Sequence, residues 1–185
     1  MRARRVVAGL WLFVVVAAAV GCAGSAGSTK TLATAPEPGA RARYTKVVLA
    51  TTAEGPAAGM DAADRERIAA LVARKIKERA PGRVVNFAGT TTDAVTDPDT
   101  MFVTIAFTRY DPGNAFARFT LAGLGQIHVN ADVTLEDRAR PAVLGEFAVT
   151  KTFAWGGIYG GLTDIKDVED GFAEAVANVV LGEPS

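Results

Sequence analysis

The amino-acid sequence predicts an α+β domain, a mostly antiparallel sheet with two helices packed on one face, in the order β-α-β-β-β-β-α. Apolar residues recur with helical spacing in two segments, one after Asp61 and one from about Asp164 to Leu181. Apolar and polar residues alternate strictly over 126–136, which is typical of a strand with one buried and one wet face. Helices that cover one face of a sheet leave its other face wet, so the two patterns fit one architecture.

Five strands are predicted from segments that are rich in β-branched and aromatic residues or that alternate. In chain order they are Tyr44–Ala50, Arg83–Phe87, Met101–Arg109, 126–136 and Val143–Phe153. The last two are expected to form a long antiparallel hairpin, because only the short turn Asp137–Pro141 separates them. Asp111-Pro-Gly-Asn114 has the residues of a tight turn.

The two predicted helices each carry one apolar stripe. Asp61 is suited to cap the first helix, Asp64 suits its N-terminal dipole, and Pro81-Gly82 ends it. Asp164 begins the second helix and Gly182 closes it. The stripe residues are Ile68, Leu71, Val72 and Ile76 in the first helix, and Ile165, Val168, Phe172, Val176 and Val179 in the second.

The chain divides into a signal peptide over 1–21, a flexible tether over 22–43 and a single domain over 44–185. Three arginines precede an apolar run from Val6 to Val20, and small residues follow, which is the order of a secretory signal. The run has 15 residues, and a membrane-spanning helix needs about 20. The tether is rich in Ala, Gly, Ser, Thr and Pro and has no apolar periodicity.

Cys22 is the only cysteine of the chain and follows the small residue Gly21. The segment resembles the lipobox of bacterial lipoproteins, which is cleaved between the equivalents of Gly21 and Cys22 and acylated on the cysteine. Cleavage by the ordinary signal peptidase is the alternative, and it would leave Cys22 as an unpaired thiol. Ala23 stands where some bacteria use Asp to retain lipoproteins in the inner membrane, so the outer membrane is favoured.

Composition excludes several function classes. Removal of 21 residues leaves 164, enough for one domain with a core of its own. Three of the 20 basic residues lie in the signal, so the rest of the chain has 17 basic and 20 acidic residues. This charge balance argues against nucleic acid as a partner. One histidine and no further cysteine argue against a zinc site, and no residue pattern implies a cofactor.

Three groups of residues are candidates for a reactive or binding site. His128 lies on the polar face of the alternating strand without a nucleophile or orienting partner, so we expect a surface histidine and no catalytic residue. Asp93, Asp97 and Asp99 lack the spacing of a calcium loop, and we expect a solvated loop and no metal. The Gly-rich run from Trp155 to Asp164 is expected to be a hinge or tight turn. The alternative is a partner contact through Trp155 and Tyr159.

The run Tyr110–Asn114, the run Ala117–Gly125 and the hairpin that follows resemble a bacterial lipoprotein family known as domain of unknown function 4410. The resemblance covers about Lys46 to the C-terminus and is most specific over Arg118–Asp137. The family often has Asp-x-x-Thr-Gly in the hairpin turn, where this chain has Asp137-Arg-Ala-Arg-Pro. It has no established activity, so the resemblance implies no catalytic residue.

The segment from Phe116 to Leu124 is apolar, and two interpretations are open for it. It is expected to belong to the core and to the entry of the next strand, with a partner-binding edge as the alternative. The spaced Gly123 and Gly125 predict a bend where two backbone segments approach closely.

These observations predict a non-enzymatic accessory protein or scaffold of the cell envelope, anchored by acylated Cys22 with its domain in the periplasm. The expected partners are the membrane and another envelope protein, and the expected contact residues are Trp155, Tyr159, Arg118 and Phe119. The alternative function is a module for a small ligand or glycan. It would use Trp155 and the polar face of the hairpin, formed by Gln126, His128, Asn130 and Asp132.

Overall fold

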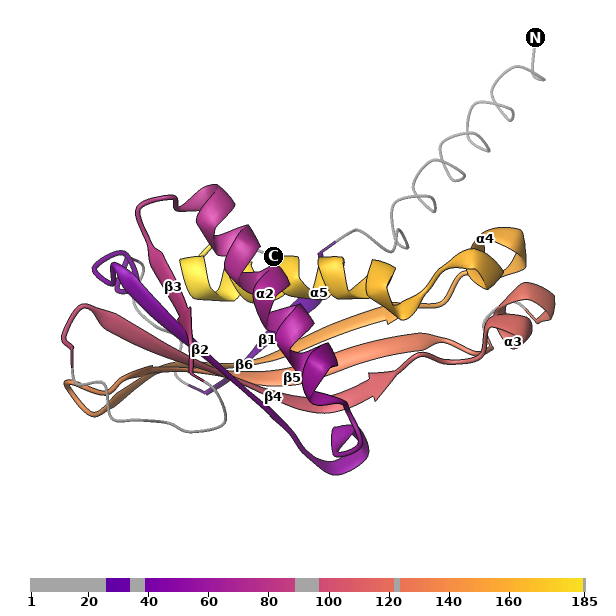
Figure 1. Cartoon of the computed structure of the whole chain (residues 1–185), viewed down its shortest axis with the longest axis horizontal. Coiled ribbons are helices and arrows are strands. Elements are labelled where there is room, and N and C mark those ends of the chain that lie inside the picture. The colour runs from indigo at the N-terminus through magenta and orange to yellow at the C-terminus, as the bar shows by residue number, and fades with distance from the viewer. Residues whose placement is uncertain (1–25, 34–38, 89–96, 122–123, 185) are drawn as a thin grey trace, which may run out of the picture.

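The computed structural model describes residues 26–33, 39–88, 97–121 and 124–184 (Figure 1). Six strands form one sheet, in the order β1-β6-β5-β4-β2-β3. The strands are β1 (Ser28–Ala33), β2 (Lys46–Ala53), β3 (Val84–Phe87), β4 (Thr100–Asp111), β5 (Ile127–Asp137) and β6 (Ala142–Phe153). The helices are α2 (Ala62–Arg79), α3 (Ala115–Thr120), α4 (Gly157–Leu162) and α5 (Ile165–Leu181), with a 3₁₀ turn at Gly55–Ala57.

Helices α2 and α5 lie side by side on one face of the sheet, as predicted (Figure 1). The apolar side chains of both helices meet those of β2, β4, β5 and β6 in one core. Ile68, Val72 and Ile76 of α2 are fully buried, and so are Phe172 and Val176 of α5. Burial of such side chains stabilises by about 1.5–3 kcal/mol each, so this layer supplies most of the stability of the fold.

The sheet is mixed, and the prediction of a mostly antiparallel sheet was wrong. β2 runs parallel to both of its neighbours, β3 and β4. A parallel neighbour needs a crossover connection, and α2 provides it between β2 and β3. β4 starts beside Lys46, at the end of the sheet where β2 also begins, so these two strands are parallel as well. Side-chain alternation predicts strands but carries no information on their direction.

Strand β1 lies within the segment predicted to be a flexible tether. It pairs antiparallel with β6, with Ser28 opposite Thr150 and Thr31 opposite Phe147. Five of its six residues are exposed. An edge strand of this kind is held mainly by backbone hydrogen bonds, so it needs no apolar alternation, and the periodicity of the sequence could not reveal it.

The hairpin β5–β6 and the ends of α5 confirm their predictions. The hairpin pairs from Ile127 opposite Phe153 to Asp137 opposite Ala142. Asp164 caps α5 in a capping box with Asp167, and Gly182 ends the helix in the left-handed conformation. Asp61 occupies the N-cap position of α2, but its side chain makes no capping hydrogen bond.

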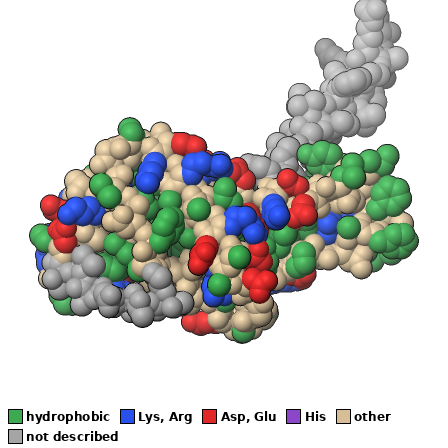
Figure 2. Space-filling model, viewed as in Figure 1, with side chains coloured by type: hydrophobic (Ala, Val, Ile, Leu, Met, Phe, Trp, Pro, Cys, Tyr) green, Lys and Arg blue, Asp and Glu red, His purple; other side chains and the backbone are tan. Residues whose placement is uncertain are grey.

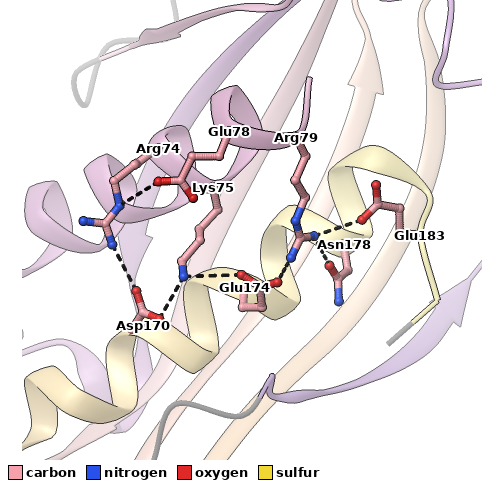
Figure 3. Close-up of polar contacts among 8 residues, drawn as sticks. All are labelled: Arg74, Lys75, Glu78, Arg79, Asp170, Glu174, Asn178 and Glu183. Atoms are coloured by element: carbon pink, nitrogen blue, oxygen red, sulfur yellow. Dashed lines mark hydrogen bonds and ion pairs between the residues drawn. The ribbon is translucent and has the colours of Figure 1, made fainter. Parts of the chain in front are cut away.

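A row of ion pairs joins α2 to α5 along their exposed side (Figure 3). Lys75 Nζ lies 2.8 Å from Asp170 Oδ2 and 3.4 Å from Glu174 Oε2, and Arg79 contacts Glu174 and Asn178. Arg74 Nη2 lies 3.0 Å from Asp170 Oδ1. Each exposed pair is worth about 0–1 kcal/mol, so the row fixes the register of the helices more than it stabilises the fold.

Candidate functional site

Helices α3 and α4 stand side by side at one end of the molecule, beyond the ends of β4, β5 and β6 (Figure 1). We call this region the apolar tip, residues 112–121, 124–126 and 154–163. Most of its large apolar side chains are exposed, Leu162 by 81% and Phe116 by 75%. The exposed set is Phe116, Phe119, Leu121, Leu124, Trp155, Ile158, Tyr159 and Leu162. Figure 2 shows hydrophobic side chains gathered over this end.

The core interpretation of Phe116–Leu124 was therefore wrong, and the Gly-rich run forms helix α4 instead of a simple turn. The spacing of Phe116, Phe119 and Leu121 suits either a strand entry or a short helix, and burial cannot be read from apolarity alone. Here the turn at Pro112–Asn114 carries the chain beyond the sheet, where no helix covers it. Exposed large apolar patches on a monomer mark interaction sites.

Arg118 holds the two helices of the tip together. Its side chain is 3% exposed and donates four hydrogen bonds to backbone carbonyls. Nε donates to Gly160 O at 2.8 Å, Nη1 to Pro112 O and Gly125 O at 3.0 and 2.7 Å, and Nη2 to Thr163 O at 3.0 Å. A planar guanidinium can serve four acceptors around its rim, which a lysine cannot do. Arg118 was predicted as a partner contact, but its burial gives it a structural role.

Two glycines allow the backbone segments of the tip to approach one another. Gly125 has a φ of +69°, and a Cβ there would lie 2.3 Å from the carbonyl oxygen of Asn114. This confirms the predicted close approach at Gly125, whereas Gly123 lies outside the described residues. A Cβ on Gly160 would lie 2.0 Å from the carbonyl oxygen of Trp155. The Asn114 side chain accepts a hydrogen bond from the Ala117 amide and so begins α3.

The outer surface of the tip is formed by apolar side chains. A shallow cleft of about 280 Å³ between the helices is lined by Ala115, Phe116, Phe119, Ile158, Gly161 and Leu162. Behind it the rings of Trp155 and Tyr159 meet edge to face at 6.2 Å, and Tyr159 lies 6.4 Å from the buried ring of Phe153. The aromatic residues of the tip are therefore supported by the core.

Charge is absent from the surface of the tip. In the sequence, Arg118 is the only charged residue in 112–126, and 154–163 contains none. Because Arg118 is buried, the described tip exposes apolar and neutral polar groups only. Charged residues return immediately at its base, where Arg109 pairs with Asp111 and where Asp164 and Lys166 begin α5. This charge depletion is the sequence signal that could have identified Phe116, Ile158 and Leu162.

The predicted contact residues have different outcomes. Trp155, Tyr159 and Phe119 lie together on the tip and are 42%, 60% and 52% exposed. They stay predicted contacts. Gly21 and Cys22, the predicted cleavage and acylation site, lie outside the described residues.

The polar face of the hairpin lies on the side of the sheet opposite α2 and α5. Asp132 is exposed, and Gln126, His128 and Asn130 are half-buried. His128 Nδ1 lies 3.0 Å from Thr152 Oγ1 on the neighbouring strand. Burial and the nearby Arg109 guanidinium hold the pKa of His128 below its ordinary value.

The acidic loop residues that are described form local pairs. Lys46 Nζ lies 2.5 Å from Asp97 Oδ2, and the Asp99 amide donates to Asp97 Oδ1 at 3.1 Å. The hydrogen bond from Lys46 lowers the pKa of Asp97. Asp93 lies outside the described residues. Within the described ranges, His, Cys, Asp and Glu form no group of three that could hold a metal ion.

A buried carboxylate lies between α2, β4 and α5. Glu169 is fully buried, and Arg67 binds it through Nε at 2.8 Å and Nη2 at 2.6 Å. Tyr110 Oη donates to Glu169 Oε1 at 2.7 Å, and burial together with this bond raises the pKa of Tyr110. The three groups satisfy one another, so we assign the cluster to packing.

Among the described residues, no helix is both long and apolar enough to cross a bilayer.

Comparisons with known proteins give the family and the fold. The chain is similar to PelC from Paraburkholderia phytofirmans, a dodecamer, with 16% identity, a TM-score of 0.54, and coverage of 86% of this chain and 99% of PelC. A single-substitution variant of PelC gives a TM-score of 0.53 at 16% identity, with coverage of 82% and 96%. A protein from Xanthomonas campestris has 13% identity and a TM-score of 0.41 over 80% of this chain and 87% of its own.

At these identities the likeness shows a shared fold, and only for PelC does the TM-score support it. Curated proteins gave no match. The model of one family, described as "Domain of unknown function (DUF4410)", matches residues 51–157, more than half of the chain. The match includes α3, the β5–β6 hairpin and Trp155. The chain therefore belongs to the DUF4410 family.

Proposed function

We propose that the protein is a lipid-anchored accessory protein of the bacterial envelope, with Cys22 acylated and the domain in the periplasm. In this function the apolar tip binds another component of the envelope, and the protein acts by binding instead of by catalysis. The outer membrane is the favoured membrane.

The observation that carries the proposal is the exposure of the tip. Eight large apolar side chains share one end of the molecule, five of them from two short helices and three from the segments that flank these helices. Arg118 and two close glycine contacts hold that end in a defined shape. A rigid apolar surface of this kind favours binding, because little conformational entropy is lost when a partner covers it.

Assembly with further copies of the chain belongs to the same proposal. PelC, which shares the fold, is a dodecamer. Two edges of the present sheet, β1 and β3, pair with no second strand among the described residues. Free edges can pair with another chain, so copies of this protein are candidate components of the assembly.

Two measurements in the native host test the proposal. The mass of the mature N-terminus should show acyl chains on Cys22, and Cys22→Ser should abolish them. A photoreactive amino acid at Tyr159 should yield a near-stoichiometric adduct with an envelope component, protein or lipid. The same group at Val143, which is 46% exposed at the opposite end of β6, serves as the control. An unacylated mature protein, or equal adducts at both positions, would contradict the proposal.

A ligand-binding module is the second candidate, favoured by the polar residues that share the open face of the hairpin. His128, Asn130 and Asp132 lie at alternate positions of β5, with Thr152 opposite His128. Soluble cell-wall fragments should then raise the melting temperature, and His128→Ala should reduce the shift. Trp155 lies beyond the end of β6, so a ligand that uses both sites must extend along the hairpin.

A further inference from the structure

We infer that the apolar tip enters the bilayer, in the same leaflet that holds the acyl chains of Cys22. This inference rests on the proposed lipidation and names the partner of the tip as lipid. It gives the domain two attachments to one membrane, a covalent lipid and a folded apolar surface.

The chemistry of the tip fits the membrane interface better than a protein partner. Its exposed side chains are Phe, Leu and Ile together with Trp155 and Tyr159. Trp and Tyr prefer the level of the headgroups, where a ring can lie in apolar surroundings while its polar atom stays hydrated. Protein interfaces usually add a charged or polar rim with specific hydrogen bonds. The surface of this tip carries no charged side chain itself, and the nearest charged residues lie at its base.

The backbone of the tip is also prepared for an apolar environment. An unsatisfied backbone carbonyl costs several kcal/mol in lipid, which is why exposed irregular loops do not enter the hydrocarbon. Arg118 satisfies the carbonyls of Pro112, Gly125 and Thr163 in the irregular segments and that of Gly160 in the short helix α4. The guanidinium lies beneath the surface of the tip, so its charge is shielded from lipid by the protein itself.

The position of the anchor places the tip against the same membrane. Ser28 is the first residue of β1 and lies opposite Thr150, only three residues before β6 ends at Phe153 and the tip begins. The Gly27 amide donates to Gly171 O in the second turn of α5 at 2.9 Å, which fixes the chain on this side. Cys22 precedes Gly27 by five residues, and five residues in an extended conformation span at most about 17 Å. Trp155 follows Thr150 by five residues, which is about 17 Å in the direction of β6 at about 3.3 Å per residue. The acyl chains of Cys22 and the apolar tip can therefore reach one leaflet.

Charged residues at the base limit how deep the tip can enter. Arg109 and Asp111 end β4, and Asp164 and Lys166 begin α5. A charged side chain at the centre of a bilayer costs at least about 2.5 kcal/mol, so these residues stay at the headgroups. Insertion to this depth leaves the hairpin, its polar face and both sheet edges outside the membrane.

The test uses the lipidated protein and its own tryptophan. Trp11 lies in the predicted signal, so after cleavage Trp155 is the only tryptophan. The protein is reconstituted into vesicles of phosphatidylethanolamine and phosphatidylglycerol, with and without bromine on the acyl chains. We expect a blue shift of the Trp155 emission on reconstitution and quenching by the brominated chains. The control protein carries Trp155→Phe and Val143→Trp, which moves the reporter about 40 Å, to the opposite end of β6, and it should not be quenched.

Variants separate insertion from mere proximity. Phe116→Ser with Leu162→Ser should abolish the quenching of Trp155, while the mass of the acylated N-terminus and the circular dichroism stay unchanged. The control pair Leu32→Ser with Val143→Ser replaces two exposed apolar side chains away from the tip and should leave quenching unchanged. A non-acylated Cys22 would contradict the proposed function. An acylated, vesicle-bound protein whose Trp155 is not quenched, or whose tip crosslinks to a protein, would overturn this inference and leave the anchoring intact.

Discussion

Arg118 shows how one buried charge can organise an otherwise apolar region. It donates to four carbonyls that belong to the turn before α3, the loop after it, α4 and the segment before α5. Phe116 and Phe119 beside it are exposed, so local exposure gives no sign that Arg118 is buried. The sequence predicted Arg118 to contact a partner, whereas the structure buries it. Burial of this charge depends on contacts with residues some 40 positions away.

Replacement of Arg118 should loosen the tip. Arg118→Met would remove this donor from four carbonyls, of which that of Gly125 keeps the Asn114 amide, and we expect the free energy of unfolding to fall by about 2–4 kcal/mol. Amide hydrogen exchange should become faster in α3 and α4 and stay unchanged in β5. Arg118→Lys keeps the charge but not the fork of donors, so it should show most of the same loss. Unchanged exchange in α3 and α4 would contradict the assigned role.

Asp137 is the second residue whose role emerged only from the structure. Its buried carboxylate accepts hydrogen bonds from Tyr44 Oη at 2.9 Å, Arg43 Nη2 at 2.9 Å and the Arg140 amide at 3.0 Å. It thereby joins the hairpin turn to the chain just before β2. Burial alone would raise the pKa of Asp137, but the hydrogen bonds outweigh it and hold the pKa below its ordinary value.

Asp137→Asn should lower the free energy of unfolding by about 1–3 kcal/mol at neutral pH. The folded pKa lies below the unfolded value of about 3.9, so the stabilising contribution is complete above that pH and is lost as the pH falls through the folded pKa. The difference between the two proteins in urea unfolding should therefore be constant from pH 7 to about pH 5 and shrink below about pH 3.9. A difference that grows towards low pH would contradict this sign.

At the scale of elements, apolar periodicity predicted the strands and helices that build the core. α2, α5 and the hairpin each bury one regular face, and their patterns are correspondingly strong. β1 has no such face, and α3 and α4 pack mainly on one another, so their patterns carried no burial signal. The parallel pairing of β2 with β3 and β4 depends on where the connections return, which no strand encodes by itself.

The contact between α2 and α5 should depend on salt only weakly. Glu174→Gln removes one carboxylate partner of both Lys75 and Arg79, and we expect a loss of about 0.5–1 kcal/mol in the free energy of unfolding. In 1 M salt, where the Debye length is about 3 Å, the difference should become smaller. A larger loss that persists in high salt would mean that the pairs do more than set helix register.

At the scale of the whole molecule, the protein has two apolar regions, one buried and one exposed. One is enclosed between the helices and the sheet, and the other is presented to the outside at the end of the sheet (Figures 1 and 2). Phe172 in the first packs on Phe107 with ring centroids 5.7 Å apart, whereas Phe116 in the second is 75% exposed. The same residue type thus stabilises the fold in one place and is available for binding in the other.

Matched truncations should separate these two roles. Phe172→Ala should lower the free energy of unfolding by about 3–5 kcal/mol, because it leaves a cavity in the core. Phe116→Ala should change it by less than about 0.5 kcal/mol, because the side chain is exposed in the folded protein. Urea unfolding of both variants measures the contrast. A large loss for Phe116→Ala would mean that the tip is part of the stabilising core.

The sequence by itself determined the family, the two core helices and the hairpin. These features are local, since each depends on side-chain spacing or on a short motif that neighbouring residues carry. Only the tertiary structure decided the mixed sheet, the pairing of β1, the burial of Arg118 and the exposure of Phe116 and Leu162. Each of these depends on which distant segment lies alongside, and apolar spacing gives the same pattern whether or not another layer covers it.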